Sequence, residues 1–229
     1  MITIVGTGHI FNISPNLKNL FTKIQPDVIC VELDKNRYNA LKNRYQDSKS
    51  HSEKRRNLPL FYTLFLRFQQ RSARKFGVNP GDEMLTAINY AQKNNLPFKF
   101  IDGDFQIIYQ KIMESLTLKE KLKLAFVALF LTFFGWYLTR RKKVEKDLEK
   151  FDKNFDKNLQ KMQASYPIIK KFLLDDRNKH MAKKIMKLKE KHRNIVACVG
   201  DGHVVGISRI LKENNVDFKA IRLKSLLYT

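Results

Sequence analysis

The chain has 229 residues, a hydrophobic content of 43% and a formal net charge of +22, from 44 Lys and Arg against 22 Asp and Glu. The hydrophobic content excludes wholesale disorder, and the length is sufficient for one substantial core with an appended subdomain. The positive charge attracts polyanions, but the lysines are spread over helix faces and no nucleic-acid-binding signature accompanies them. We therefore do not expect nucleic acid as a partner.

The two cysteines, Cys30 and Cys198, each lie inside an apolar run. This placement favours buried, reduced thiols over a disulfide or a zinc site. The chain opens on the strand-like run Ile2–Val5 and shows no secretory signal with its basic, apolar and small-residue regions. Together these features predict a cytoplasmic protein of a reducing compartment.

Five short runs rich in β-branched and aromatic residues predict strands. Between the first two, Ser14 and Pro15 have the positions of an N-cap and a first helical residue. Strand, helix and strand in succession form a βαβ unit, whose strands are parallel, and a helical pattern also separates the last two runs. The sequence therefore predicts an α/β fold with a mainly parallel sheet and flanking helices. The predicted strands are Ile2–Val5, Val28–Leu33, Phe98–Ile101, Ile195–Val199 and the weaker Phe218–Leu223.

The middle of the chain, from Gln106 to about His192, contains no convincing strand. Apolar residues recur every three or four positions over 144–162, as in an amphipathic helix, and Pro167 interrupts this pattern before a second helical stretch. We expect an all-helical insertion, a helical hairpin, between the third and fourth strands. The predicted organisation is the N-terminal part of the α/β core at 1–105, the insertion at 106–192 and the C-terminal part of the core at 193–229.

Within this insertion, Leu124–Thr139 carries no charged residue and is followed by the basic run Arg140–Lys143. A helix of that length measures about 24 Å, which is short for a membrane with a hydrocarbon core of roughly 30 Å. A single span would also put the two ends of the α/β core on opposite sides of the membrane. We expect the helix to be covered by protein, within the monomer or in a symmetric homodimer. Association with an anionic membrane surface remains the alternative.

Glycines, histidines and carboxylates follow the ends of the predicted strands. In an open parallel sheet, ligands bind beyond this carboxyl edge, where the loops after several strands meet. The repeated Gly-x-x-His segments that end at His9 and His203 predict one shared site, in which the glycines provide positive φ angles or close approach. Two neutral imidazoles and a carboxylate such as Glu32 suit a divalent metal ion, whose bound water could attack a carbonyl. The residues at these strand ends are Gly6, Thr7, Gly8, His9, Glu32, Asp34, Asp102, Asp104, Gly200, Asp201, Gly202 and His203.

A structural interpretation competes with this one. The histidines would then belong to turns, Asp201 would cap the last long helix, and Glu32 would form a buried ion pair with Arg37 or Arg177. The other histidines lie in Lys-rich surroundings and are interpreted as surface residues: His51, His180 and His192.

Six segments, in order, resemble those of the TraB/PrgY family, also called the pheromone-shutdown family, over nearly the whole chain: VGTGH, VELDKNR, NPGDEMLTAINYA, IDGD, LLDDRNKHM and VGDGHVVGI. That family is related to the TIKI proteins, which are regarded as metalloproteases that use two GxxH histidines and a glutamate. The resemblance implies that His9, His203 and Glu32 are catalytic and metal-binding residues. Further motif positions are matched by Gly6, Thr7, Gly200, Arg37, Glu83 and Arg177. We expect Arg37 and Arg177 to be catalytic, and we expect Gly6, Thr7, Glu83, Gly200 and the strand-end residue Asp102 to bind substrate.

Two positions depart from the family pattern. Gly103 stands where the family usually has an arginine, and Asp176 replaces the usual glutamate before Arg177. The leading hypothesis is a metal-dependent, peptidase-like hydrolase with a divalent metal ion as cofactor and a peptide as substrate. The alternative is a non-catalytic regulatory protein of the same fold, whose basic and apolar middle region associates with a membrane or with a second subunit.

Overall fold

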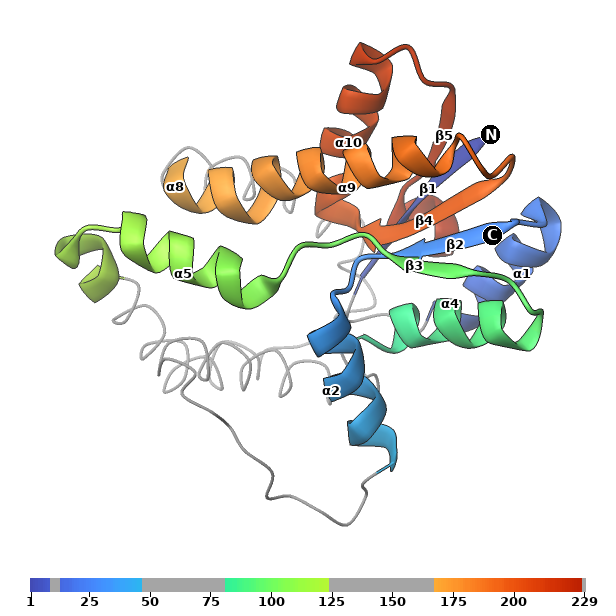
Figure 1. The fold of residues 1–229 in the computed structure, drawn as a ribbon, viewed down its shortest axis with the longest axis horizontal. Coiled ribbons are helices and arrows are strands. Elements are labelled where there is room, and N and C mark those ends of the chain that lie inside the picture. The colour runs from blue at the N-terminus through green and yellow to red at the C-terminus, as the bar shows by residue number, and fades with distance from the viewer. Residues whose placement is uncertain (9–12, 47–80, 124–166, 228–229) are drawn as a thin grey trace, which may run out of the picture.

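The computed structural model describes residues 1–8, 13–46, 81–123 and 167–227, and these form one all-parallel sheet with helices on both faces (Figure 1). The five strands have the order β3-β2-β4-β1-β5. All the predicted strands are present, with ends shifted by at most two residues, so the predicted α/β fold is confirmed. The strands are β1 Ile2–Thr7, β2 Val28–Val31, β3 Phe98–Phe100, β4 Ile195–Gly200 and β5 Phe218–Ile221.

The helices lie on the two faces of the sheet, with α1 and α4 on one face and α9 and α10 on the other (Figure 1). The segments α8, η2 and α9 follow one another without a gap, and η2 is a short π-helix. The helices that lie wholly within the described residues are α1 Ser14–Ile24, α2 Lys35–Gln46, α4 Asp82–Lys93, α5 Phe105–Ser115, α8 Pro167–Lys170, η2 Lys171–Asp175, α9 Asp176–Leu188, α10 Asp201–Glu213 and α11 Leu223–Leu227.

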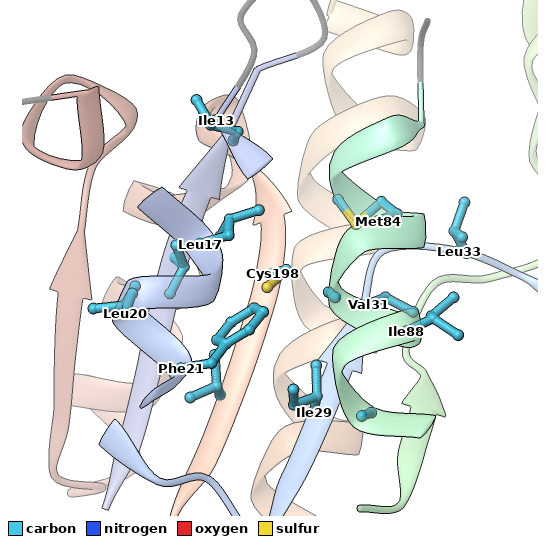
Figure 2. Close-up of a cluster of buried hydrophobic side chains, with 14 of the residues drawn as sticks. Ile13, Leu17, Leu20, Phe21, Ile29, Val31, Leu33, Met84, Ile88 and Cys198 are labelled. Atoms are coloured by element: carbon cyan, nitrogen blue, oxygen red, sulfur yellow. The ribbon is translucent and has the colours of Figure 1, made fainter. Parts of the chain in front are cut away.

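Alternation along the strands divides the core into two apolar layers, because successive side chains of a strand point to opposite faces. On one face, Phe21 of α1 and Met84 of α4 pack over Cys198 of β4 (Figure 2). On the other face, Met181 of α9 and Ile207 of α10 pack over the alternate strand residues. The strand residues of the first layer are Val5, Ile29, Val31, Val196 and Cys198, and those of the second are Ile2, Ile4, Val28, Cys30, Ile195, Ala197 and Val199.

The first helix begins differently from the sequence prediction. Ser14 is the first residue of α1, and the N-cap is Ile13, which makes no side-chain capping bond. The Ser14 hydroxyl instead lies 2.9 Å from the Thr86 hydroxyl of α4. A tertiary hydrogen bond has therefore replaced the local cap that the sequence pattern favoured.

Topology places the two Gly-x-x-His strands side by side. The parallel pairing of β1 with β4 aligns Thr7 with Gly200, although the two residues are almost the full chain apart. On its other side β4 pairs with β2, and Val31 is opposite Cys198. The carboxyl ends of β2, β4 and β1 are consequently neighbours, with β4 in the centre.

The described residues between β3 and β4 are mostly helical and include no strand, as expected for an all-helical insertion. Its last helix, α9, contributes Met181, Ala182 and Ile185 to the core. Residues 124–166, which include Leu124–Thr139, lie outside the described ranges, so the covering of that run and the proposed dimer stay predictions. In the part of the chain that the structure describes, no helix is long and apolar enough to cross a membrane.

Both cysteines are free and buried, as the sequence predicted. Burial raises the pKa of Cys30 to about 12 and also raises the pKa of Cys198. Both thiols therefore remain protonated at neutral pH and act as small apolar core residues.

Candidate functional site

Glu32 lies directly after β2, and the alternation of that strand directs its side chain toward α9 and α10, on the same face as Val28 and Cys30. The residue is only 9% exposed. Its Oε2 accepts a hydrogen bond of 2.6 Å from the Gly200 amide at the end of β4. Its Oε1 accepts from Arg177 Nη2. Three elements that are distant in the sequence thus meet at this carboxylate.

The charge of Glu32 is stabilised in spite of its burial. Burial by itself opposes ionisation, but the neighbouring His203 and Arg177 and the Gly200 amide outweigh it and lower the pKa of Glu32. Glu32 is therefore a carboxylate at neutral pH. A carboxylate with a lowered pKa is a weak general base, so this geometry suits a ligand or an electrostatic role better than proton abstraction.

Asp102, which follows β3, is the second carboxylate of the cluster, and its side chain is fully buried. It accepts hydrogen bonds from Arg177 Nε at 3.0 Å and from Arg177 Nη2 at 2.8 Å. Arg37 Nη1 of α2 donates to Asp102 at 3.0 Å, and the amide of Gly103 donates at 2.8 Å. Asp102 therefore holds α2, α9 and the end of β3 together.

The two arginines that the sequence offered as partners of Glu32 have different environments. Arg177 is 9% exposed and bonds Glu32, Asp102 and the Leu173 carbonyl. Both carboxylates raise its pKa against the effect of burial. Arg37 has a 36% exposed side chain, gives one N–H to Asp102 and lies 5.8 Å over the ring of Phe105. Among the described residues no other partner of its guanidinium is found.

His203 lies in the first turn of α10 and is 5% exposed. Its Nε2 is 3.3 Å from Glu32 Oε1, and its Nδ1 is 2.7 Å from Asn178 Oδ1 of α9. The predicted neighbourhood of His203 and Glu32 is therefore present. His9, the other predicted histidine, lies outside the described residues, although β1, the strand that precedes it, runs beside β4.

The motif glycines have a different explanation from the one that the sequence suggested. Gly81 is the only described glycine with a positive φ, and Gly200 has φ −55°. A Cβ on Gly6 would lie 2.2 Å from Asp201 Oδ1, and one on Gly200 would lie 3.3 Å from Glu32 Oε2. These glycines make room for carboxylates of neighbouring strands and helices.

Other predicted site residues have structural partners. The Thr7 hydroxyl donates to the Val199 carbonyl at 3.2 Å. Asp201 does not cap its own helix: it accepts from Arg222 and from the Leu223 amide at the start of α11. Glu83 is buried at the start of α4, on the face of the sheet opposite α9 and α10, and accepts from the Gly81 amide at 3.2 Å.

Among the remaining histidines, His180 is exposed, as predicted, whereas His192 is partly buried, with Nδ1 3.6 Å from Asp27. Sequence reasoning missed Asn178, which lies on the buried stripe of α9 with Met181, Ala182 and Ile185. A polar residue at a buried position of an amphipathic helix was the signal that could have revealed it.

The structure is that of a parallel α/β protein with a buried cluster of histidine, carboxylate and arginine side chains at the carboxyl edge of its sheet. The model of the TraB/PrgY/gumN family matches residues 1–216, and the chain belongs to that family. It is 32% identical to the uncharacterized protein MJ1365 of Methanocaldococcus jannaschii over an alignment that covers 97% of this chain. The alignment covers 56% of that relative, so the chain spans little more than half of its length.

We expect Gly6→Ala to destabilise the fold by about 1–3 kcal/mol, because the added methyl group would overlap the Asp201 carboxylate. Gly103→Ala is the matched control, since its Cβ would meet only Ile108, at an ordinary 3.5 Å. Urea unfolding of both variants measures the difference. Equal stability of the two variants would contradict the packing role of Gly6.

The lowered pKa of Glu32 predicts a defined pH dependence of stability. Its folded pKa lies below the reference value of 4.5, so the unfolded chain takes up the proton first and stability is lost as pH falls below about 4.5. The free energy of unfolding of wild type should exceed that of Glu32→Gln most at neutral pH, and the gap should narrow in acid. A gap that does not change between pH 7 and pH 3 would refute this assignment.

Proposed function

We propose that the chain is a metal-dependent hydrolase that acts on peptide-like substrates at the carboxyl edge of its sheet. The observation that carries the proposal is the pair formed by His203 Nε2 and Glu32 Oε1, 3.3 Å apart. An imidazole nitrogen beside an ionised carboxylate oxygen is a donor set that suits Zn²⁺ and related divalent ions. His9 would complete the predicted ligand set. Within the described ranges no group of three or more such ligands occurs, and His9 lies outside them.

Each residue of the site would have a separate role in such a reaction. Such a metal ion would acidify a bound water and polarise a substrate carbonyl. Glu32 and His203 would hold it, and Arg177 would keep Glu32 ionised and correctly oriented. Arg37 would anchor an anionic substrate group, since most of its guanidinium N–H groups have no partner among the described residues.

The second candidate is a non-catalytic regulatory protein of the same fold. It is favoured by the fact that both oxygens of Glu32 already accept protein hydrogen bonds, as in a purely structural ion pair. Apolar side chains are also exposed near the start of the insertion, namely Ile107, Leu118 and Leu122 at 53%, 73% and 62%. In this proposal the insertion would associate with an anionic membrane surface or with a second copy of the chain.

Metal analysis separates the two candidates. We expect the purified wild type to hold a stoichiometric divalent transition metal and His203→Gln to lose it, because one imidazole ligand is removed. His192→Gln is the matched control, since that imidazole lies elsewhere, beside Asp27. Elemental analysis by mass spectrometry gives the stoichiometry. A metal-free wild type after purification and reconstitution would favour the non-catalytic candidate.

The role of Arg37 predicts a preference for anionic substrates. Peptides with a free terminal carboxylate should be cleaved about 10- to 100-fold more efficiently than their amides, as a charge-assisted hydrogen bond would provide. Arg37→Met should abolish this preference, whereas Lys35→Met, on the same helix, should preserve it. Values of kcat/KM for matched peptide pairs measure the effect. An unchanged preference in Arg37→Met would eliminate Arg37 as the anchor.

A further inference from the structure

Asn178 places an amide on the apolar stripe of α9, in contact with the candidate site. The residue is 5% exposed, and the residues that follow it on the stripe, Met181, Ala182 and Ile185, are apolar. Burial of an amide is unfavourable unless its polar atoms are hydrogen-bonded, so an apolar residue here would be the simpler choice for stability. The hydrogen-bond partner of the amide must therefore account for its presence at this buried position.

That partner is His203. The carbonyl oxygen of Asn178, Oδ1, lies 2.7 Å from His203 Nδ1. A carbonyl oxygen only accepts hydrogen bonds, so Nδ1 must carry the proton. The other ring nitrogen, Nε2, is then directed to Glu32 Oε1, 3.3 Å away. Asn178 thus determines which nitrogen of the imidazole faces the carboxylate.

Gly206 on α10 makes this arrangement sterically possible. A Cβ at position 206 would lie 2.1 Å from Asn178 Nδ2 and 2.8 Å from its Cγ. Gly206 is not a hydrogen-bond partner of His203 or Glu32. Any side chain at position 206 would nevertheless displace the Asn178 amide from between α9 and α10. We call Asn178 and Gly206 the positioning pair.

We propose that the positioning pair holds His203 in the form protonated on Nδ1, so that Nε2 is the nitrogen offered beside Glu32 and to a divalent metal ion. Hydrogen bonding of the second imidazole nitrogen is the usual means by which a metal-binding histidine is oriented. The metal part of this inference rests on the proposed function. The protonation of Nδ1 is independent of it, because it follows from the contact between the two side chains.

Nitrogen NMR of metal-free protein with ¹⁵N-labelled histidine tests the protonation directly. We expect the Nδ1 of His203 to carry a proton in wild type and in Asn178→Asp, whose carboxylate can only accept. In Asn178→Leu, Nδ1 has no acceptor and should lose its proton. A bare Nδ1 in wild type, or loss of the Nδ1 proton in Asn178→Asp, would overturn the proposal, since Asn178 would then be the donor.

Titration with Co²⁺ tests the consequence for metal binding. Asn178→Leu and Gly206→Ala should both weaken Co²⁺ binding by about 10- to 100-fold, while Asn178→Asp should retain it. Gly103→Ala, whose Cβ meets only an ordinary contact, is the control for a glycine substitution at the same edge. Thermal unfolding of each variant establishes that it is folded.

Failure of the proposed function and failure of the positioning pair would give different results. A wild type that binds no Co²⁺ contradicts the proposed function, and the NMR measurement still decides the role of Asn178. Wild-type Co²⁺ affinity in both Asn178→Leu and Gly206→Ala would refute the positioning pair while leaving the metal site intact.

Discussion

The buried guanidinium of Arg177 links α9 to the ends of two strands, and the arrangement of the whole edge depends on it. It pairs with Glu32 after β2 and with Asp102 after β3, and all three side chains are almost inaccessible to water. A buried charge is tolerated only when it is paired and hydrogen-bonded, so none of the three can move independently. The helical segment between β3 and β4 is thereby joined electrostatically to the sheet.

Close packing imposes a second constraint at the same edge. At three positions a glycine leaves the space that a polar side chain of another element fills: Gly6 for Asp201, Gly200 for Glu32 and Gly206 for Asn178. The glycines of the two Gly-x-x-His segments are thus explained by their neighbours in space. The φ angles contribute little, because among the described glycines only Gly81 lies in the left-handed region.

These constraints bear on the chemistry that the site could perform. Arg177 has its hydrogen-bonding capacity committed to the protein, whereas Arg37 retains an exposed guanidinium at the rim. Glu32 is held ionised, and His203 is held by Asn178 on one side and faces Glu32 on the other. Fixed side chains of this kind are what a metal or substrate site requires, because orientation then needs no rearrangement on binding.

Much of this architecture followed from local sequence signals. Strands were predictable because β-branched and aromatic runs end at polar and glycine residues, and a parallel sheet directs such ends to one edge. On that basis the sequence predicted that Glu32 and His203 would be neighbours. The two arginines were also identified, but which of them pairs with Glu32 remained open, since it depends on how α9 docks on the sheet.

The elements, the sheet edge and the types of residue gathered there could be derived from the sequence, because they depend on periodicity and on the turn preferences of neighbouring residues. Three further features became known from the folded chain: β4 lies between β1 and β2, Glu83 belongs to the opposite face, and Asn178 reaches His203 over Gly206. Each of these depends on contacts between elements that are remote in the chain. Such contacts are set by the packing of whole helices against a sheet, and no local pattern of residues encodes that packing.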